Sequence, residues 1–356
     1  MSYPILRVDL QKIKKNGEVL IRETAKRGVS LWAVSKGISA YPEIAAAYKE
    51  AGFKVIADSR IANIRKMKEA GVDADYALIR IPMLSELEEV VELCTYSLVS
   101  ELETIKSISR ICEAKGKEHS CVLMFDMGDL REGFWFTEIE NMCEELKKIS
   151  PLLKIEGVGA NFSCASGVLP SYENMSLLAD YGEMLGRAMG KKLPIVSGGG
   201  TCSFVRMLEG NMPDRVNNLR IGEALLLGSD TSFGMNIDIL AQNTMKIEAE
   251  FVEIRKKPTL PIGEVCHEAF GNVPVFEDRG DRLRGILAIG KQDVRIEGLV
   301  PLDSRMQIIT ASSDHLLVDI EECCGEYKLG DIASFYPDYT SMLSASTSPY
   351  VTKVFE

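Results

Sequence analysis

The sequence predicts a (β/α)8 barrel followed by a C-terminal, mainly β domain. Eight short apolar runs alternate with longer segments that carry apolar residues at helical spacing, and this alternation ends near residue 230. Beyond that point strand-like runs follow one another with almost no helix between them. An open doubly wound sheet usually has about five or six strands and a GxGxxG turn, which is absent here. We therefore expect a barrel at residues 1–235 and a β domain at residues 236–356.

Each barrel strand is expected where a short apolar run ends in polar or charged residues, as in LWAVSK and KVIADS. Each helix is expected where apolar residues recur every three or four positions with charges between them. The predicted barrel strands lie within 31–36, 54–59, 75–81, 96–101, 121–128, 154–162, 193–201 and 218–228, and helices cover 42–51, 60–70, 102–114, 138–148 and 172–189. Strands of the second domain are expected within 244–255, 284–294, 306–313, 315–320 and 331–337.

Composition narrows the function classes. The net charge is −11 and no basic run occurs, which argues against a nucleic-acid partner or an anionic membrane surface. Nine cysteines form no CxxC pair, as is typical of reduced thiols in a cytosolic protein. The N-terminus lacks the apolar run of a signal peptide, and no stretch approaches the ~20 apolar residues of a membrane span. We expect a cytoplasmic protein that acts on a small molecule.

The active site of a βα barrel forms at the C-terminal ends of its strands. Lys36 ends the first strand, where a partly dry environment would lower the pKa of its amine and favour imine formation with an aldehyde. The alternative is a lysine that simply leaves the strand for solvent. Arg220, at the eighth strand, would add a cation, unless it pairs with Asp214 or Glu223 at the rim.

A glycine-rich turn follows the seventh strand and precedes a predicted helix. Its glycines would let backbone N–H groups approach a phosphate, and the helix N-terminus adds positive potential. Strands seven and eight are the usual phosphate-binding region of such barrels. The turn runs from Ser197 through Gly200 to Thr201.

Metal chemistry is not expected. The chain has three histidines, and neither an HxH nor an HExxH pattern occurs. His119 lies in the charged stretch KGKEHS and is expected to face solvent.

Four motifs, in order and at the predicted strand ends, resemble the fold-type III pyridoxal-phosphate (PLP) enzymes, the alanine racemase-like family. The family's AVVKA, DTGMGRLG, RxGI and CMDQLMVD motifs correspond here to AVSKG at 33–37, DMGDLREG at 126–133, RIGE at 220–223 and SSDHLLVD at 312–319. The resemblance runs nearly end to end.

The resemblance implies that Lys36 binds PLP as a Schiff base and then acts as a base on one face of the substrate Cα. It implies that Arg220 faces the pyridine nitrogen. Because an arginine cannot hand over a proton, the ring would delocalise charge less and transamination would be suppressed. The implied cofactor-binding residues are Lys36, Asn161, Ser197, Gly200, Thr201, Arg220, Gly222 and Glu223, and the implied substrate-binding residues are Arg131, Ser313 and Asp314.

Three departures from the family pattern matter. Asn161 stands where the family has a histidine beside the cofactor ring, and the tyrosine four residues after the lysine is missing, with Tyr41 five residues on. The family's second base, a tyrosine of the β domain, has no counterpart in GEVCHEAF at 263–270. His267 is the best candidate because its titration range suits proton transfer in both directions, with Cys266 and Glu268 as alternatives. In the family this base reaches the other subunit's site, which implies a head-to-tail homodimer.

The implied activity is PLP-dependent racemisation of an amino acid by removal of its Cα proton. The sequence is most similar to the ornithine racemase branch, so ornithine or a similar basic amino acid is the expected substrate. The candidate partners for its cationic side chain are Asp129, Glu132, Glu268 and Asp314.

Other readings stay open. The racemase could act on alanine, serine or lysine, or have broad specificity. A PLP-binding homeostasis protein is a barrel alone, which the second domain argues against. A D-threonine aldolase-like lyase needs a metal-binding His/Asp pair that is not visible.

Overall fold

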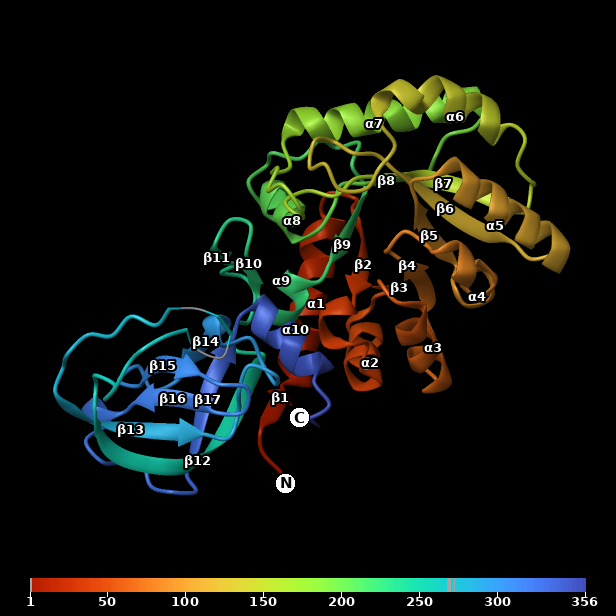
Figure 1. Ribbon diagram of the computed structural model, residues 1–356. Coiled ribbons are helices and arrows are strands. Elements are labelled where there is room, and N and C mark those ends of the chain that lie inside the picture. Colours follow the sequence, from red (N-terminus) through yellow and green to blue (C-terminus); the bar gives the residue numbers. More distant parts are fainter. Residues whose placement is uncertain (1, 268–269, 272) are drawn as a thin grey trace. The chain divides into compact units, whose positions relative to one another are not determined.

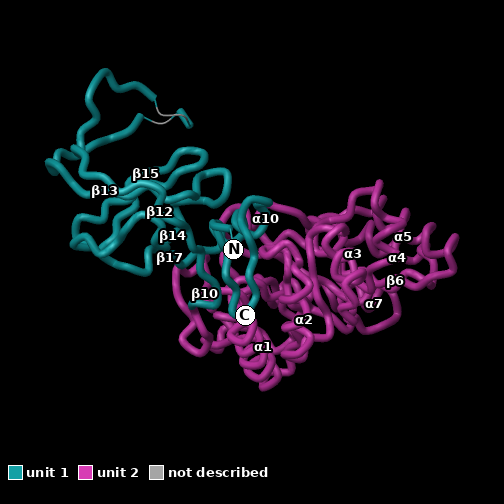
Figure 2. The backbone as a smooth tube through the Cα atoms, turned by 90° about the horizontal axis from the view of Figure 1, so that it is seen from below, with its two compact units in different colours: residues 1–9, 243–356 teal, residues 10–242 magenta. Residues whose placement is uncertain are grey.

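The computed structural model describes residues 2–267, 270–271 and 273–356. The chain divides into two compact units, Leu10–Gln242 and a second unit made of Met1–Asp9 with Asn243–Glu356 (Figure 2). Among the described residues, no helix combines the length and the apolar character needed to cross a membrane. The domain boundary expected at 235/236 stays a prediction.

The first unit contains a closed parallel barrel of eight strands, which confirms the predicted fold class (Figure 1). Each strand pairs with the next strand of the barrel along the chain, and the last strand closes on the first, with Ser30 opposite Asn218 and Ala33 opposite Ile221. The barrel strands are β2 Ser30–Val34, β3 Val55–Asp58, β4 Asp75–Leu78, β5 Tyr96–Val99, β6 His119–Met124, β7 Leu153–Gly159, β8 Ile195–Ser197 and β9 Asn218–Ile221.

Helices follow the strands and lie outside the barrel (Figure 1). Their local signals are ordinary ones: Pro42 begins α2, Ser171 caps α7 by accepting a hydrogen bond from the Asn174 amide, and Gly116 ends α5 at positive φ. The helices of this unit are α1 Leu10–Ala25, α2 Pro42–Ala51, α3 Ile61–Glu69, α4 Leu87–Leu93, α5 Leu102–Lys115, α6 Ile139–Leu146, α7 Tyr172–Ala188, α8 Thr201–Leu208 and α9 Glu223–Leu227.

The barrel interior is filled by side chains rather than by solvent. Trp32, Val34 and Val55 pack there with smaller residues of the neighbouring strands. Helices cover the outer faces, so both faces of the strands are buried, which explains why the strands read as nearly continuous apolar runs. The remaining buried members of this cluster are Ala57, Ala77, Leu98, Val122 and Met124.

The second unit is a mainly antiparallel sheet, which confirms the expected β domain, with one unexpected member. β1 (Ile5–Val8), at the start of the chain, pairs with β12 and with the last strand, β18, rather than with the barrel. The other elements of this unit are β12 Met245–Pro258, β13 Asp281–Leu287, β14 Leu299–Pro301, β15 Gln307–Ala311, β16 Leu316–Asp319, β17 Ile332–Pro337, α10 Tyr339–Thr347 and β18 Thr352–Phe355.

The expectation that His119 faces solvent is wrong. His119 is the first residue of β6 and is 2% exposed. Its Nε2 lies 2.9 Å from Ser97 Oγ and its Nδ1 lies 3.1 Å from the Cys94 carbonyl oxygen. Because a carbonyl only accepts, Nδ1 carries the proton and Nε2 accepts from Ser97. The strand begins two residues earlier than its apolar run suggested, and this places the ring inside.

Candidate active site at the barrel mouth

Lys36 stands directly after β2, at the end of the barrel where the strands finish, which we call the barrel mouth. Its neighbour Ser35 is fully buried and donates a hydrogen bond to the Asp58 carboxylate at 2.6 Å. Asp58 also accepts from the Arg60 amide and from Asn63, each at 2.9 Å. Asp58 therefore ties the ends of β2 and β3 together and fixes the backbone that carries Lys36.

The electrostatics around Lys36 lower the pKa of its amine. The side chain is reachable by solvent, yet the surrounding protein desolvates its amine and lowers its pKa. The charges of Arg131 and Arg220 lower this pKa further, while Cys164 and Asp58 act in the opposite direction. A lysine with a lowered pKa has more of the unprotonated amine that attacks a carbonyl carbon.

Arg220 lies on β9 and is 6% exposed. It donates hydrogen bonds to Ser197 Oγ, to the Ala160 carbonyl at 2.7 Å and to Asn161 Oδ1 at 2.9 Å. Burial lowers its pKa to about 10, so the guanidinium is still charged at neutral pH. The alternative of pairing with Asp214 or Glu223 does not occur, because all three acceptors are neutral oxygens.

The donors that remain on Arg220 suit an acceptor from a ligand. Three of the five N–H groups of a guanidinium are used, and Nε and one Nη1 hydrogen have no acceptor in the described part of the chain. A buried cation held only by neutral oxygens, with donors left over, fits an anionic cofactor that presents a ring nitrogen as an acceptor.

Asn161, two residues beyond the end of β7, joins Arg220 to a second arginine. Its Nδ2 donates to Glu132 Oε1 at 2.8 Å. Glu132 in turn accepts hydrogen bonds from Nε and Nη2 of Arg131. Arg131, Glu132, Asn161 and Arg220 thus form one continuous chain of polar contacts, which we call the arginine link.

The loop that carries Arg131 and Glu132 leaves the barrel after β6 and returns beside it. Asp126 holds the outgoing turn by accepting from the amides of Gly128 and Leu130. Gly133, at φ +152°, closes the loop, and a Cβ atom there would lie 2.1 Å from the Asp126 nitrogen. The glycine is required because only it lets the two backbone segments approach this closely.

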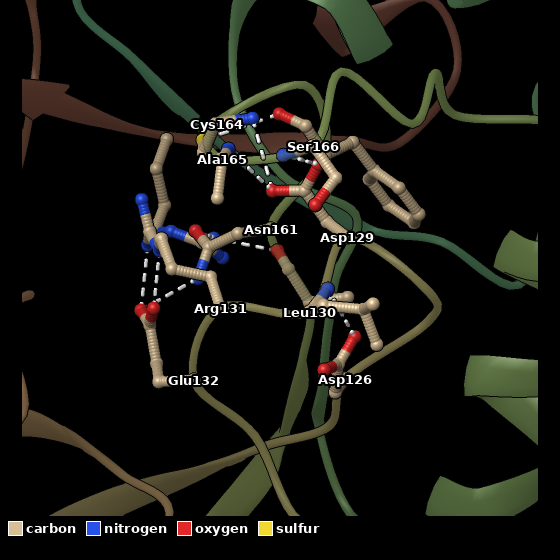
Figure 3. A network of polar contacts seen from close by, with 12 residues as sticks. Asp126, Asp129, Leu130, Arg131, Glu132, Asn161, Cys164, Ala165 and Ser166 are labelled. Carbon is tan, nitrogen blue, oxygen red and sulfur yellow. Dashed lines mark hydrogen bonds and ion pairs between the residues drawn. The ribbon is translucent and has the colours of Figure 1, made fainter.

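Asp129, an expected partner for a cationic substrate, instead binds the loop that follows β7. Its carboxylate accepts from four backbone amides of the neighbouring loop, which belong to Cys164, Ala165, Ser166 and Val168 (Figure 3). Burial alone would raise its pKa, but these four donors outweigh burial and the pKa is lowered. Both carboxylate oxygens are occupied by the loop.

The turn after β8 has the form of a phosphate cradle. Gly199 adopts φ +101°, and the first two amides of α8, those of Thr201 and Cys202, precede the first hydrogen bonds of the helix, which the Ser203 and Phe204 amides donate to Gly200. The Thr201 hydroxyl accepts from the Ala224 amide at 3.3 Å, so this turn lies against the start of α9. Two helix N-termini therefore meet at one end of the mouth, and the backbone amides there suit a phosphate.

Two of the expected cofactor ligands use their side chains elsewhere. Ser197 Oγ donates to Asn218 at 2.6 Å while it accepts from Arg220. The Glu223 carboxylate accepts from Ser229 and Thr231, and burial raises its pKa. At Gly222 and Glu223 the backbone is what could reach a phosphate.

The substrate-binding residues expected in the second unit lie in the exposed turn between β15 and β16. Asp314 accepts from Ser313 Oγ at 2.6 Å and from Gln292. Gly290 has no room for a Cβ atom, which would meet the Ser313 carbonyl at 2.1 Å. The turn is therefore braced, and the expected role of Ser313 and Asp314 stays a prediction.

The second-base candidates lie in the segment between β12 and β13. Cys266 and His267 are exposed and belong to no strand. Glu268 lies outside the described residues. Within residues 2–267, 270–271 and 273–356, no group of three His, Cys, Asp or Glu residues is arranged to hold a metal ion.

Sequence reasoning missed the residues that brace the site. The sequence pattern places Asp58 at a strand end but predicts no role for Asp58, Ser35 or Asn218, although all three make bracing hydrogen bonds. Asn218 joins Ser197 to Ser30, which lies 188 residues away in sequence. No spacing pattern could have revealed these contacts, because each joins different strands.

Two relatives match over essentially the whole length. The chain is 38% identical to the ornithine racemase of Acetoanaerobium sticklandii over 353 residues, which is 99% of each protein. It is also 38% identical to the lysine racemase of Thermotoga maritima over 356 residues, or 100% of this chain and 99% of that protein.

Solved structures share the fold. The alanine racemase of Streptomyces lavendulae superposes with a TM-score of 0.78 at 16% identity, covering 100% of this chain and 98% of that one. The alanine racemase of Bartonella henselae, solved with covalently bound pyridoxal phosphate, gives 0.75 at 17% identity and covers both chains fully. The family model for the alanine racemase N-terminal domain matches residues 8–230.

The fold and these relatives define the class of protein, a PLP-dependent amino-acid racemase. The chain belongs to the alanine racemase family, matched through its N-terminal domain.

Proposed function

We propose that this racemase interconverts the enantiomers of a basic amino acid, with ornithine as the first candidate substrate. We propose that Lys36 is the residue that holds PLP. The observation that carries the site assignment is the position of Lys36 at the barrel mouth, where burial and two arginines lower the pKa of its amine. Relatives of ornithine and of lysine specificity, each 38% identical, support a substrate with a side-chain ammonium. Lysine is therefore the second candidate.

In this proposal the chain's own groups bind, orient and move protons. PLP, when bound, supplies an electron sink for the negative charge left on Cα. Lys36 Nζ takes the Cα proton on one face, for which its lowered pKa is suited. The backbone amides at the starts of α8 and α9, next to Gly200, Thr201 and Gly222, would hold the phosphate of the cofactor.

The two arginines would orient the reacting groups. Arg220 directs its unused donors at the ring nitrogen and keeps its own proton, because even its lowered pKa of about 10 lies well above neutral pH. Arg131 has N–H groups beyond those given to Glu132, and these can bind the substrate carboxylate.

Recognition of the substrate ammonium falls to the remaining acidic candidates. Asp129 is unsuited, because four backbone amides occupy its carboxylate. Glu132 is unsuited as well, because its carboxylate is already bound within the arginine link. Asp314, in the β domain, and Glu268, which lies outside the described residues, stay as candidates for this contact.

We further propose that His267 of a second copy of the chain supplies the acid or base on the other face of Cα. A mixing experiment tests both the base and the head-to-tail dimer. The Lys36→Ala and His267→Gln proteins are each expected to be inactive. An equal mixture should recover about a quarter of the wild-type activity, because about half of the dimers are mixed and each mixed dimer has one intact site of its two. Subunit exchange is monitored by sedimentation. If exchange occurs and no activity is recovered, a site shared between subunits is rejected.

The central test combines an absorbance spectrum with chiral product analysis. Purified protein should show the visible band of enzyme-bound PLP, the Lys36→Ala variant should lack it, and L-ornithine should yield D-ornithine. A PLP band with D-lysine alone would assign the second candidate. No band after reconstitution with PLP would overturn the assignment of Lys36.

A further inference from the structure

The arginine link contains two residues at which this chain departs from its family. Glu132 stands at the position of the leucine in the DTGMGRLG motif, and Asn161 stands at the position of the histidine. The two side chains contact each other directly, through Asn161 Nδ2 and Glu132 Oε1 at 2.8 Å, although they lie 29 residues apart. The two departures therefore form one structural feature.

The chemistry of the partners allows Asn161 one orientation. A guanidinium only donates hydrogen bonds and a carboxylate only accepts them. The amide must therefore turn its oxygen to Arg220 and its nitrogen to Glu132, as observed. A leucine at position 132 would remove the acceptor that holds the nitrogen side, and the amide could then rotate away from Arg220.

Glu132 also fixes the rotation of Arg131. Its two oxygens accept from Nε and Nη2 of that guanidinium, so one edge of the planar group is bound (Figure 3). The Nη1 edge has no hydrogen-bond acceptor among the described residues. The Glu132 side chain is 20% exposed, so these contacts are only partly screened by solvent.

We propose that Glu132 is a positioning residue that aligns both arginines of the site, Arg131 directly and Arg220 through Asn161. The inference rests on the proposed function, in which Arg220 faces the ring nitrogen of PLP and Arg131 binds the substrate. By holding the Asn161 amide, Glu132 keeps the N–H groups of Arg220 pointing in one direction. It also leaves one edge of the Arg131 guanidinium free to bind the substrate carboxylate.

The test uses reconstituted holoenzyme with PLP labelled with 15N in its ring, so that the nitrogen resonance reports the hydrogen bond from Arg220. Glu132→Leu and Asn161→Leu are each expected to shift this resonance from its wild-type position. The double variant should shift it no further than Asn161→Leu alone, because Glu132 reaches Arg220 only through Asn161. Glu132→Leu should also raise KM for the amino acid roughly tenfold through Arg131.

Controls separate the outcomes. Glu140→Leu, on the exposed face of α6, should leave the resonance and KM unchanged. Glu132→Gln keeps the shape of the side chain and one acceptor oxygen, so its effects on the resonance and on KM should be intermediate. It replaces Glu132→Leu in the test if the leucine variant fails to fold. Shifts that add in the double variant, or a wild-type resonance and KM in Glu132→Leu, would overturn the proposal. A resonance that does not respond to Arg220→Lys would instead reject the proposed role of Arg220.

Discussion

Arg220 donates a hydrogen bond from Nη2 to Oδ1 of Asn161 at 2.9 Å, deep in a barrel mouth where its other partners are Ser197 and a backbone carbonyl. A permanent cation is thus held by neutral oxygens. Such a group can hydrogen bond to a pyridine nitrogen but does not transfer its proton to it. In the proposed function, this relationship would limit how far the bound cofactor can delocalise negative charge.

Replacing Arg220 with glutamate should raise transamination relative to racemisation. A carboxylic acid can protonate the ring nitrogen, which strengthens the electron sink and prolongs the carbanion. We expect racemisation to fall at least tenfold, since the acceptors of Arg220 lose their donor. The measurement is the ratio of keto acid to D-amino acid formed from L-ornithine. Arg220→Lys should leave this ratio low, and an unchanged ratio in the glutamate variant would contradict the role.

Gly133→Ala should displace the loop that carries Arg131 and Glu132. The new Cβ atom would lie 2.1 Å from the Asp126 nitrogen, and the φ of +152° is itself unfavourable for alanine. We expect a loss of about 1–3 kcal/mol in unfolding free energy, together with a raised KM. The matched control is Gly116→Ala, which also has positive φ but meets no atom within 4 Å. Equal losses in the two variants would show that backbone strain alone is responsible.

Asp129→Asn should loosen the loop that follows β7. An amide has one acceptor oxygen in place of the two that bind four backbone N–H groups. We expect faster amide hydrogen exchange at 164–168 and a loss of about 1–3 kcal/mol near neutral pH. Because the folded pKa of Asp129 is lowered, its stabilisation is present above the unfolded pKa of about 3.9 and is lost on acidification. The difference in unfolding free energy between the Asp129→Asn variant and the wild type should therefore become smaller below about pH 4.

His119→Gln should make the protein less sensitive to mild acid. Burial lowers the folded pKa of His119 to about 4, whereas the unfolded value is about 6.5. Below about pH 6.5 the His119 imidazole is protonated in the unfolded chain but stays neutral in the folded protein. The free energy of unfolding of the wild type therefore falls by up to about 1.4 kcal/mol per pH unit until the folded pKa is reached. Urea unfolding between pH 8 and pH 4 should show a shallower fall for the variant. His315→Gln, on an exposed turn, should behave like wild type.

The pattern of apolar residues was sufficient for the barrel. The number and approximate positions of the strands follow from local alternation, because a buried parallel strand and an amphipathic helix each leave a periodic signature within a dozen residues. Lys36 and Arg220 could be singled out for the same reason, since a charged residue at the end of an apolar strand must lie at the mouth of the closed barrel.

Tertiary structure decided what those residues contact. The pairing of β1 with β12 joins residues more than 230 apart, and the bonds of Asn161 to Glu132 and Arg220 span 29 and 59 residues. No local period reports such contacts, because they depend on how strands and loops converge in space. The burial of His119, the engagement of Asp129 by four amides and the arginine link are therefore properties of the folded barrel. The sequence by itself determined the class of fold and predicted the barrel mouth as the place of the active site.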